Sequence, residues 1–159
     1  MEHLWAPWRN RYVTGEEKPG EDLFRKIADS SEDSSNHVLA RTKASFAVLN
    51  RYPYNLGHLL VCPYRQVEEL SALSAQESAD LWTLVNRMVD ALKKAMKPEG
   101  FNIGLNFGTA AGAGLPKHLH IHVVPRWTND ANFLTTIAAT RIHPSDLASV
   151  YQKLLEALT

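Results

Sequence analysis

The chain has 159 residues, of which 45% are hydrophobic and 21% charged, values that suit a single globular domain over residues 1–159. Its 17 Lys and Arg residues balance 17 Asp and Glu residues, so no net field favours binding to nucleic acid or to an anionic membrane. The single cysteine, Cys62, excludes an internal disulfide and a cysteine-rich zinc site. Because the sequence has no signal-peptide pattern and no long apolar run, we expect a cytoplasmic protein without a membrane segment.

The amino-terminal segment, residues 1–36, is expected to form an arm and a polar loop. The arm carries Trp5, Trp8 and Tyr12, and the polar part is Ala28-Asp-Ser-Ser-Glu-Asp-Ser-Ser-Asn36. Such an acidic segment buries little, so we expect a surface loop and not a domain boundary.

Strands and a long helix are predicted in the middle of the chain. Apolar runs at 45–50 and 58–62 flank a Pro/Gly turn, which predicts two paired strands. Ser74-Ala-Gln-Glu77 is a capping-box pattern, and apolar residues follow it at helical spacing until Pro98 and Gly100.

The carboxyl-terminal half adds two strands and a last helix. Strands are predicted over 101–107 and 118–124, separated by a glycine-rich segment, and an apolar stripe from Leu147 to Leu158 predicts a helix. This order predicts an α+β domain in which one long central helix and a C-terminal helix pack on a mainly antiparallel sheet.

Three histidines in the run His118-Leu-His-Ile-His122 would share one face of their strand, because side chains alternate between faces. Leu119, Ile121 and Val123 would share the opposite face, where helices would cover them. An imidazole row in a core needs a partner for every ring nitrogen, so a purely structural origin is the less favoured interpretation.

Two chemistries use histidines at this spacing. One is ligation of zinc or iron by neutral imidazoles, and the other is nucleophilic catalysis by one imidazole that its neighbours orient. Successive same-face positions on one strand point in parallel directions and converge poorly on a metal, which favours a nucleophile. The preceding loop, Gly108-Thr-Ala-Ala-Gly-Ala-Gly114, is rich in small residues whose amides approach anions closely, which indicates phosphorus chemistry.

The sequence His118-Leu-His-Ile-His-Val-Val124 resembles the signature of the histidine triad nucleotide hydrolases and transferases. Upstream, Ser45-Phe-Ala-Val-Leu-Asn-Arg51 and Gly57-His-Leu-Leu-Val-Cys-Pro-Tyr-Arg65 resemble the fragile-histidine-triad branch. Downstream, Val124-Pro-Arg-Trp-Thr-Asn-Asp-Ala-Asn-Phe133 is similar to bacterial diadenosine tetraphosphate phosphorylases. The resemblance covers residues 40–147, and several motifs agree in order, which makes it specific.

The resemblance implies a catalytic role for each histidine of the run. His120 would attack the α-phosphorus of a nucleotide and become a nucleotidyl-phosphohistidine. His118 would support it as a hydrogen-bond partner, and His122 would contact the phosphate or the bridging oxygen. A neutral imidazole suits this task near neutral pH.

The resemblance also implies substrate-binding residues. His58 would support the triad from the neighbouring strand, and Asn50 would hold the ribose hydroxyls. Asn106 would contact the phosphate chain, and Gly114 would lie where a donor meets the α-phosphate. Trp127 either belongs to the core or stacks on a base.

One departure from related bacterial proteins bears on metals. Where those proteins carry a Cys-x-x-Cys zinc motif, this chain has Asp22-Leu-Phe-Arg25, so we expect no bound metal or other cofactor. Magnesium is expected only with the phosphates of the substrate. Arg51 and Lys117 are the basic residues nearest to the motifs.

The sequence therefore predicts a homodimeric histidine triad enzyme that cleaves dinucleoside polyphosphates such as diadenosine tetraphosphate, by phosphorolysis or hydrolysis. The dimer follows from the resemblance alone. The use of inorganic phosphate follows from the resemblance of residues 126–133 to the phosphorylases and from the backbone amides that the Gly108–Gly114 loop would offer, with Arg51 or Lys117 nearby. Three alternatives stay open at this point: a nucleoside phosphoramidase, a nucleotide-binding sensor with slow catalysis and, as the least favoured, a metal-dependent oxygenase or hydrolase.

Overall fold

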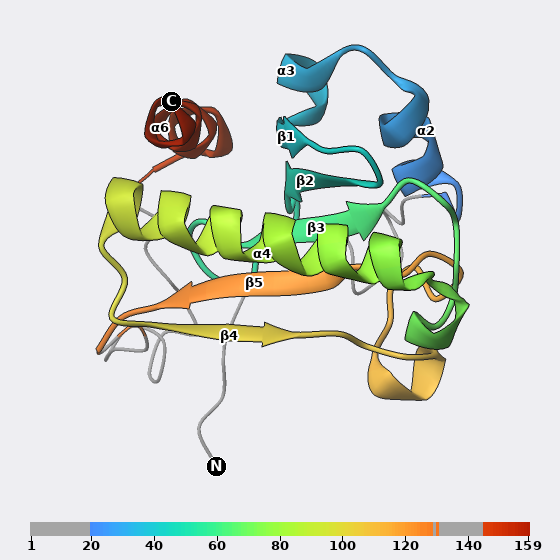
Figure 1. Ribbon diagram of the computed structural model, residues 1–159. Helices are drawn as coiled ribbons and strands as arrows, with labels where there is room; N and C mark the ends of the chain where they lie inside the picture. Colours follow the sequence, from blue (N-terminus) through green and yellow to red (C-terminus); the bar gives the residue numbers. More distant parts are fainter. Residues whose placement is uncertain (1–19, 129, 131–144) are drawn as a thin grey trace.

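The computed structural model describes residues 20–128, 130 and 145–159. In this part of the chain, five strands form one antiparallel sheet in the order β1-β2-β3-β5-β4 (Figure 1). The strands are β1 (Val38–Arg41), β2 (Ser45–Leu49), β3 (Leu59–Pro63), β4 (Gly100–Gly104) and β5 (Ile121–Arg126). The α-helices are α2 (Leu23–Asp29), α3 (Asp33–Asn36), α4 (Ala75–Met96) and α6 (Leu147–Leu158), and short 3-10 helices span Leu70–Ala72 and Thr109–Ala111. The predicted α+β class is confirmed.

Helix α4 lies along one face of the sheet (Figure 1). It begins where predicted, because the Ser74 hydroxyl accepts from the Glu77 amide while the Glu77 carboxylate accepts from the Ser74 amide. It ends at Met96, because the left-handed backbone of the C-cap residue Lys97 stops the helix just before Pro98. One face of α4 is buried against the sheet through Leu81, Leu84, Val85, Met88, Ala91 and Leu92.

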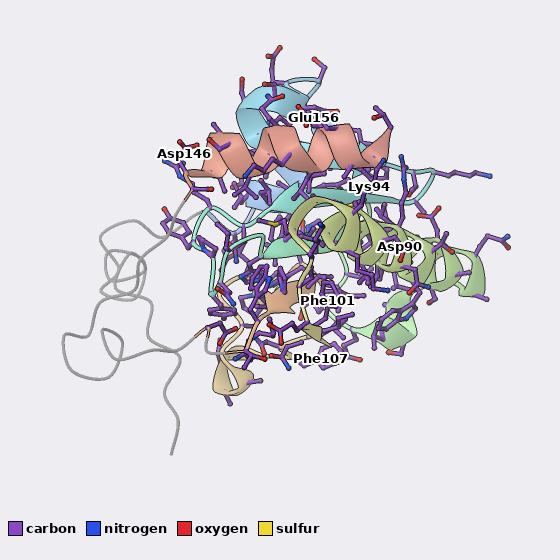
Figure 2. All side chains as sticks on the ribbon, turned by 90° about the vertical axis from the view of Figure 1, so that its left-hand side faces the viewer. Asp90, Lys94, Phe101, Phe107, Asp146 and Glu156 are labelled. Atoms are coloured by element: carbon purple, nitrogen blue, oxygen red, sulfur yellow. The ribbon has the colours of Figure 1, made fainter. Side chains whose placement is uncertain are left out.

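Helix α6 packs beside α4 and reaches β1 (Figure 2). Asp146 caps it by accepting from the Ser149 amide at 2.7 Å. The Tyr151 hydroxyl donates to the Val38 carbonyl at 3.0 Å, and Lys94 of α4 donates to the Ala157 carbonyl at 3.3 Å. Neither these helices nor the others in the described ranges combine the length and apolar character needed to cross a membrane.

The opposite face of the sheet is also covered, because β2 and β3 are buried throughout. Alternate residues of these strands face α4, and the others, including Phe46 and Leu60, pack in a second cluster with Phe24 and Ile27 of α2. Residues 28–36, predicted as a surface loop, in fact include the end of α2 and all of α3. Tertiary contacts hold these short helices, so periodicity alone gave little signal for them.

Two strand predictions need correction. The strand predicted from residue 118 begins at Ile121 and includes Pro125, which pairs with Phe101. The strand predicted over 101–107 ends at Gly104. The predicted segregation of Leu119, Ile121 and Val123 to the helix-covered face is confirmed.

Candidate active site

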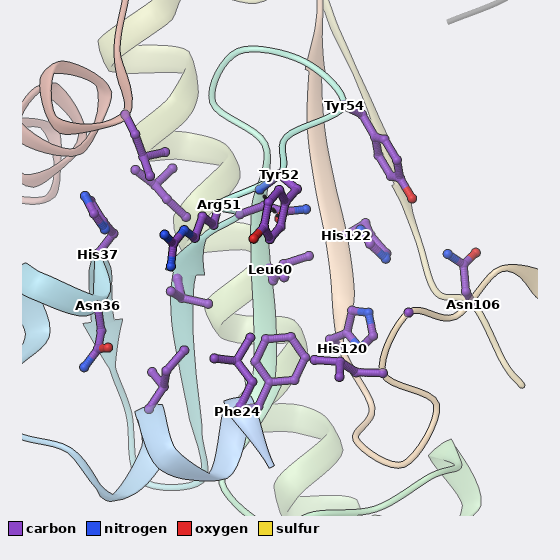
Figure 3. Close-up of a pocket in the computed structure, with 18 of the residues that line it drawn as sticks. Phe24, Asn36, His37, Arg51, Tyr52, Tyr54, Leu60, Asn106, His120 and His122 are labelled. Atoms are coloured by element: carbon purple, nitrogen blue, oxygen red, sulfur yellow. Dashed lines mark hydrogen bonds between the residues drawn. The ribbon is translucent and has the colours of Figure 1, made fainter. Parts of the chain in front are cut away.

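A cavity of about 770 Å³ lies between α2, the β2–β3 turn and the glycine-rich loop (Figure 3). Five of the predicted site residues line it: Asn50, Asn106, Gly114, His120 and His122. Figure 3 shows His120 and His122 on one wall with Asn106 across from them. The structure thus brings together residues that are up to 72 positions apart, as counted from Asn50 to His122.

The nucleophile predicted from the sequence, His120, lies just before β5 and is 8% exposed. Its Nδ1 is 2.8 Å from the carbonyl oxygen of His118. A carbonyl only accepts, so Nδ1 carries the proton and Nε2 carries a lone pair. Burial lowers the pKa of His120, since desolvation of the imidazolium outweighs the bond to the His118 carbonyl. The side chain is therefore a neutral imidazole with a nucleophilic nitrogen at neutral pH.

His118 contacts His120 through its main chain. The contact to His120 comes from the main-chain carbonyl of His118, and the His118 imidazole instead donates from Nε2 to the Pro63 carbonyl at 2.8 Å. Desolvation lowers the pKa of His118 as well. Its imidazole, 1% exposed, fastens the segment before β5 to the end of β3.

His58 and His122 form a hydrogen-bonded pair whose tautomers follow from the backbone. The Tyr54 amide donates to Nδ1 of His58 at 2.9 Å, so the proton of His58 is on Nε2. That Nε2 lies 2.9 Å from Nδ1 of His122, which must accept, and the proton of His122 is consequently on Nε2. His122 lines the cavity, and its Nε2 atom is almost fully covered. The ring of Tyr54 stacks on His58 at 4.8 Å.

The turn before His58 depends on a glycine. Gly57 has φ +73, and a Cβ atom there would lie 2.8 Å from the Met96 sulfur and 3.1 Å from a Leu92 methyl group. Only glycine fits this backbone beneath the end of α4 without displacement. The turn also orients Asn50, whose side-chain oxygen accepts from the Tyr52 amide and whose amide nitrogen lies 3.3 Å from His58 Nδ1.

The remaining predicted contacts have different outcomes. Arg51 lines the cavity, whereas Lys117 forms an ion pair with Glu21 at 2.7 Å and is not among its lining residues. Trp127 is half-buried and likewise absent from the described lining, so its stacking on a base stays a prediction. In the glycine-rich loop, the Gly112 and Ala113 amides donate to loop carbonyls, which leaves fewer amides for an anion than we predicted.

Sequence reasoning missed one wall of the cavity. Leu23, Phe24 and Ile27 of α2 line it, together with Ser35, Asn36 and His37 around the end of α3. The Phe24 ring lies 5.1 Å from the His120 ring and 5.5 Å from the His118 ring. The spacing of Leu23, Phe24 and Ile27 is typical of a helix face and was the available signal.

The arrangement bears on metal binding. Among residues 20–128, 130 and 145–159, no group of three or more His, Cys, Asp or Glu side chains is placed to hold a metal ion. Cys62 is fully buried, and burial raises the pKa of its thiol well above the usual range, so it is not a reactive thiolate. The absence of a bound metal remains a prediction.

Comparisons with known proteins agree with this geometry. Residues 31–129 match the family model of the HIT domain. A Mycobacterium tuberculosis protein named AP-4-A phosphorylase is 43% identical over 91% of this chain and 77% of its own length. The asymmetrical bis(5'-nucleosyl)-tetraphosphatase of Schizosaccharomyces pombe is 38% identical over 57% of this chain and 50% of its own.

Solved structures share the fold. The zinc-bound histidine triad family protein of Mycobacterium smegmatis superposes with a TM-score of 0.69 at 26% identity, over 87% of this chain and 95% of the other. The matched segment contains His58, the Gly108–Gly114 loop and all three histidines of the run. From the family match, the sequence identity and the arrangement of the histidines, the chain belongs to the HIT domain family, the histidine triad proteins.

Proposed function

We propose that this protein cleaves dinucleoside polyphosphates such as diadenosine tetraphosphate through a covalent nucleotidyl intermediate on His120. The observation that carries the proposal is the bond from His120 Nδ1 to the His118 carbonyl, at 2.8 Å, on a histidine that lines the cavity. This bond fixes the tautomer in which Nε2 is the nucleophile. The names of the two enzymatic relatives above support the same class of substrate.

The chemistry proceeds in two displacements. Nε2 of His120 attacks the α-phosphorus, a nitrogen–phosphorus bond forms, and the bridging oxygen leaves with the rest of the polyphosphate as ATP. The Nε2–H group of His122 donates a hydrogen bond to the phosphoryl or bridging oxygen, where negative charge increases. The adenylyl group is then transferred from His120 to an acceptor, which restores the neutral imidazole.

We propose inorganic phosphate as that acceptor. Phosphate competes with water only when a subsite binds and orients it. Arg51 supplies a cation at the cavity, and Gly114 supplies loop backbone there. The name of the Mycobacterium tuberculosis relative supports phosphorolysis, and so does the resemblance of residues 124–133 to phosphorylases.

The products of one incubation test the proposal. Diadenosine tetraphosphate is supplied with magnesium, which neutralises part of its charge, with and without inorganic phosphate. We expect ADP and ATP when phosphate is present and faster loss of substrate. AMP and ATP at millimolar phosphate would identify a hydrolase. Turnover far below about 1 per second would instead support a sensor with slow catalysis.

We also propose that the protein is a homodimer that works in the cytoplasm. Strand β4 is an edge of the sheet in the described residues (Figure 1). Its backbone edge, together with Ile103 (43% exposed) and Phe107 (46% exposed), offers a surface for a second copy. Phe107 is labelled in Figure 2. Light scattering should give twice the chain mass, and Ile103→Lys should shift the protein towards monomer.

The buried free thiol of Cys62 fits a reducing compartment, which supports the proposed cytoplasmic location.

A further inference from the structure

Arg41, at the end of β1, makes a dense set of hydrogen bonds outside the cavity. Its Nη1 and Nη2 donate to the Ala28 and Ile27 carbonyls at 3.2 and 2.9 Å. Nη2 also donates to the Ser30 carbonyl at 2.8 Å, and both Nε and Nη2 donate to Asp33. The guanidinium carbon lies 5.8 Å from the Phe46 ring centre. The planar fork of this side chain thus joins the sheet to the end of α2.

Apart from the packing of Phe24 and Ile27 in the second cluster, helix α2 has little support of its own. It has seven residues, and its N-cap, Asp22, makes no side-chain capping bond. A helix this short is unstable alone, and its last carbonyls have no partner within the helix. Arg41 donates to two of those carbonyls and places a positive charge at the negative end of the helix dipole.

Among the α2 residues that line the cavity, Phe24 is the one whose ring contacts the histidines. That ring contacts the imidazoles of both His118 and His120, at 5.5 and 5.1 Å between ring centres. It therefore covers the predicted nucleophile on one side and limits its rotation. A short path of contacts leads from Arg41 through the body of α2 to Phe24 and His120.

We propose that Arg41 is a positioning residue for the reaction: by fixing the end of α2, it holds the Phe24 ring against His118 and His120. Arg41 itself is not among the residues that line the cavity, so its effect is transmitted through the helix. The inference rests on the proposed role of His120 as nucleophile. It explains why an acidic segment that looks like a plain loop in the sequence is tied to the sheet.

The test compares three variants. Arg41→Gln should lower kcat by roughly 10- to 100-fold, because small displacements of reacting groups carry costs of that order. Arg41→Lys should restore only part of kcat, since an ammonium keeps the charge but lacks the fork. Arg65→Gln is the matched control, because Arg65 also pairs with a carboxylate, Glu77, and with a carbonyl, Ala72, away from the cavity. It should change the melting temperature without changing kcat.

A second readout is independent of substrate. The carbethoxylation rate of His120 by diethyl pyrocarbonate, followed by mass spectrometry of its peptide, should rise in Arg41→Gln and stay unchanged in Arg65→Gln. The effects of Arg41→Gln and Phe24→Leu on kcat should be non-additive, because both act on the same ring. Equal kcat and equal His120 reactivity in Arg41→Gln and in the unsubstituted protein would overturn the inference. An unsubstituted protein that cleaves no dinucleotide would overturn the proposed function instead, and the modification rates would still decide the role of Arg41.

Discussion

Nε2 of His58 lies 2.9 Å from Nδ1 of His122, and this contact links the turn before β3 to the second residue of β5. The direction of the bond is set further back, by the Tyr54 amide that donates to His58. The Tyr54 N–H therefore determines, through the His58 imidazole, which nitrogen of His122 carries the proton. The tautomer of His122 is a consequence of how the β2–β3 turn folds.

Breaking this relay should reduce turnover. In His58→Phe the aromatic ring remains, but His122 loses its donor and Tyr54 loses its acceptor, so we expect kcat to fall at least about tenfold. His58→Gln is the control, because its side-chain amide still donates and should retain more activity. Steady-state kinetics on diadenosine tetraphosphate gives the comparison. Equal losses in the two variants would show that hydrogen-bond donation by His58 does not matter.

Replacing the predicted nucleophile should abolish catalysis with little effect on the fold. His120→Asn keeps a donor for the His118 carbonyl and lacks the attacking nitrogen, so kcat should fall by at least about 1,000-fold. Nucleotide binding, measured by calorimetry, should persist. The exposure of His120 is only 8%, so His120→Ala, which also leaves space beside Phe24, should melt at a lower temperature than His120→Asn. A variant that retains a tenth of the activity would exclude His120 as the nucleophile.

Acidic pH should reduce both activity and stability. The pKa values of His118 and His120 are lowered from the ordinary 6.5, chiefly by desolvation. The unfolded chain therefore binds protons more readily, and stability is lost as pH falls from 6.5 through the folded-state values. The acid limb of kcat/KM should lie below pH 6.5, because the neutral imidazole is the nucleophile. Kinetics and melting temperatures from about pH 8 to about pH 5 test this. A limb above pH 6.5 would contradict it.

Purified protein should contain no stoichiometric zinc or iron. Asp22 and Arg25 stand where the resemblance led us to look for a zinc-binding cysteine pair, and the Asp22 carboxylate is paired with Lys26 at 2.9 Å. Elemental analysis should find far less than one metal per chain, and chelation followed by added magnesium should leave activity intact. The zinc-bound Mycobacterium smegmatis protein is a suitable positive control. One tightly held metal per chain that activity requires would refute the prediction.

Local signals in the sequence predicted the main elements of this fold. The capping box at Ser74 and the apolar spacing that follows it define α4 to within a few residues, since both are properties of the helix itself. The hairpin of β2 and β3 was equally clear, because its apolar runs flank a turn whose glycine has positive φ. These features need no knowledge of distant contacts.

The wall formed by α2 and α3 could not be predicted in the same way. Its helices are short, and the Arg41 side chain of β1 holds them by donating to main-chain carbonyls. Because every residue type has such a carbonyl, the sequence does not show which ones accept. The sequence likewise did not show that the main chain of His118, and not its imidazole, makes the contact to His120. Lys117 looked available for phosphate until the structure placed it beside Glu21. Each of these outcomes depends on partners distant in the chain or on backbone atoms.

The carbonyl that orients His120 belongs to the main chain, and this has a consequence for mutational tolerance. Any residue at position 118 would provide the same acceptor, so no single side-chain replacement deletes it. What must be preserved at 118 is the path of the backbone, which the present imidazole secures through Pro63. The tautomer of His120 therefore does not depend on which side chain stands at position 118. We expect substitutions at this position to be limited first by the packing of the side chain beside Phe24.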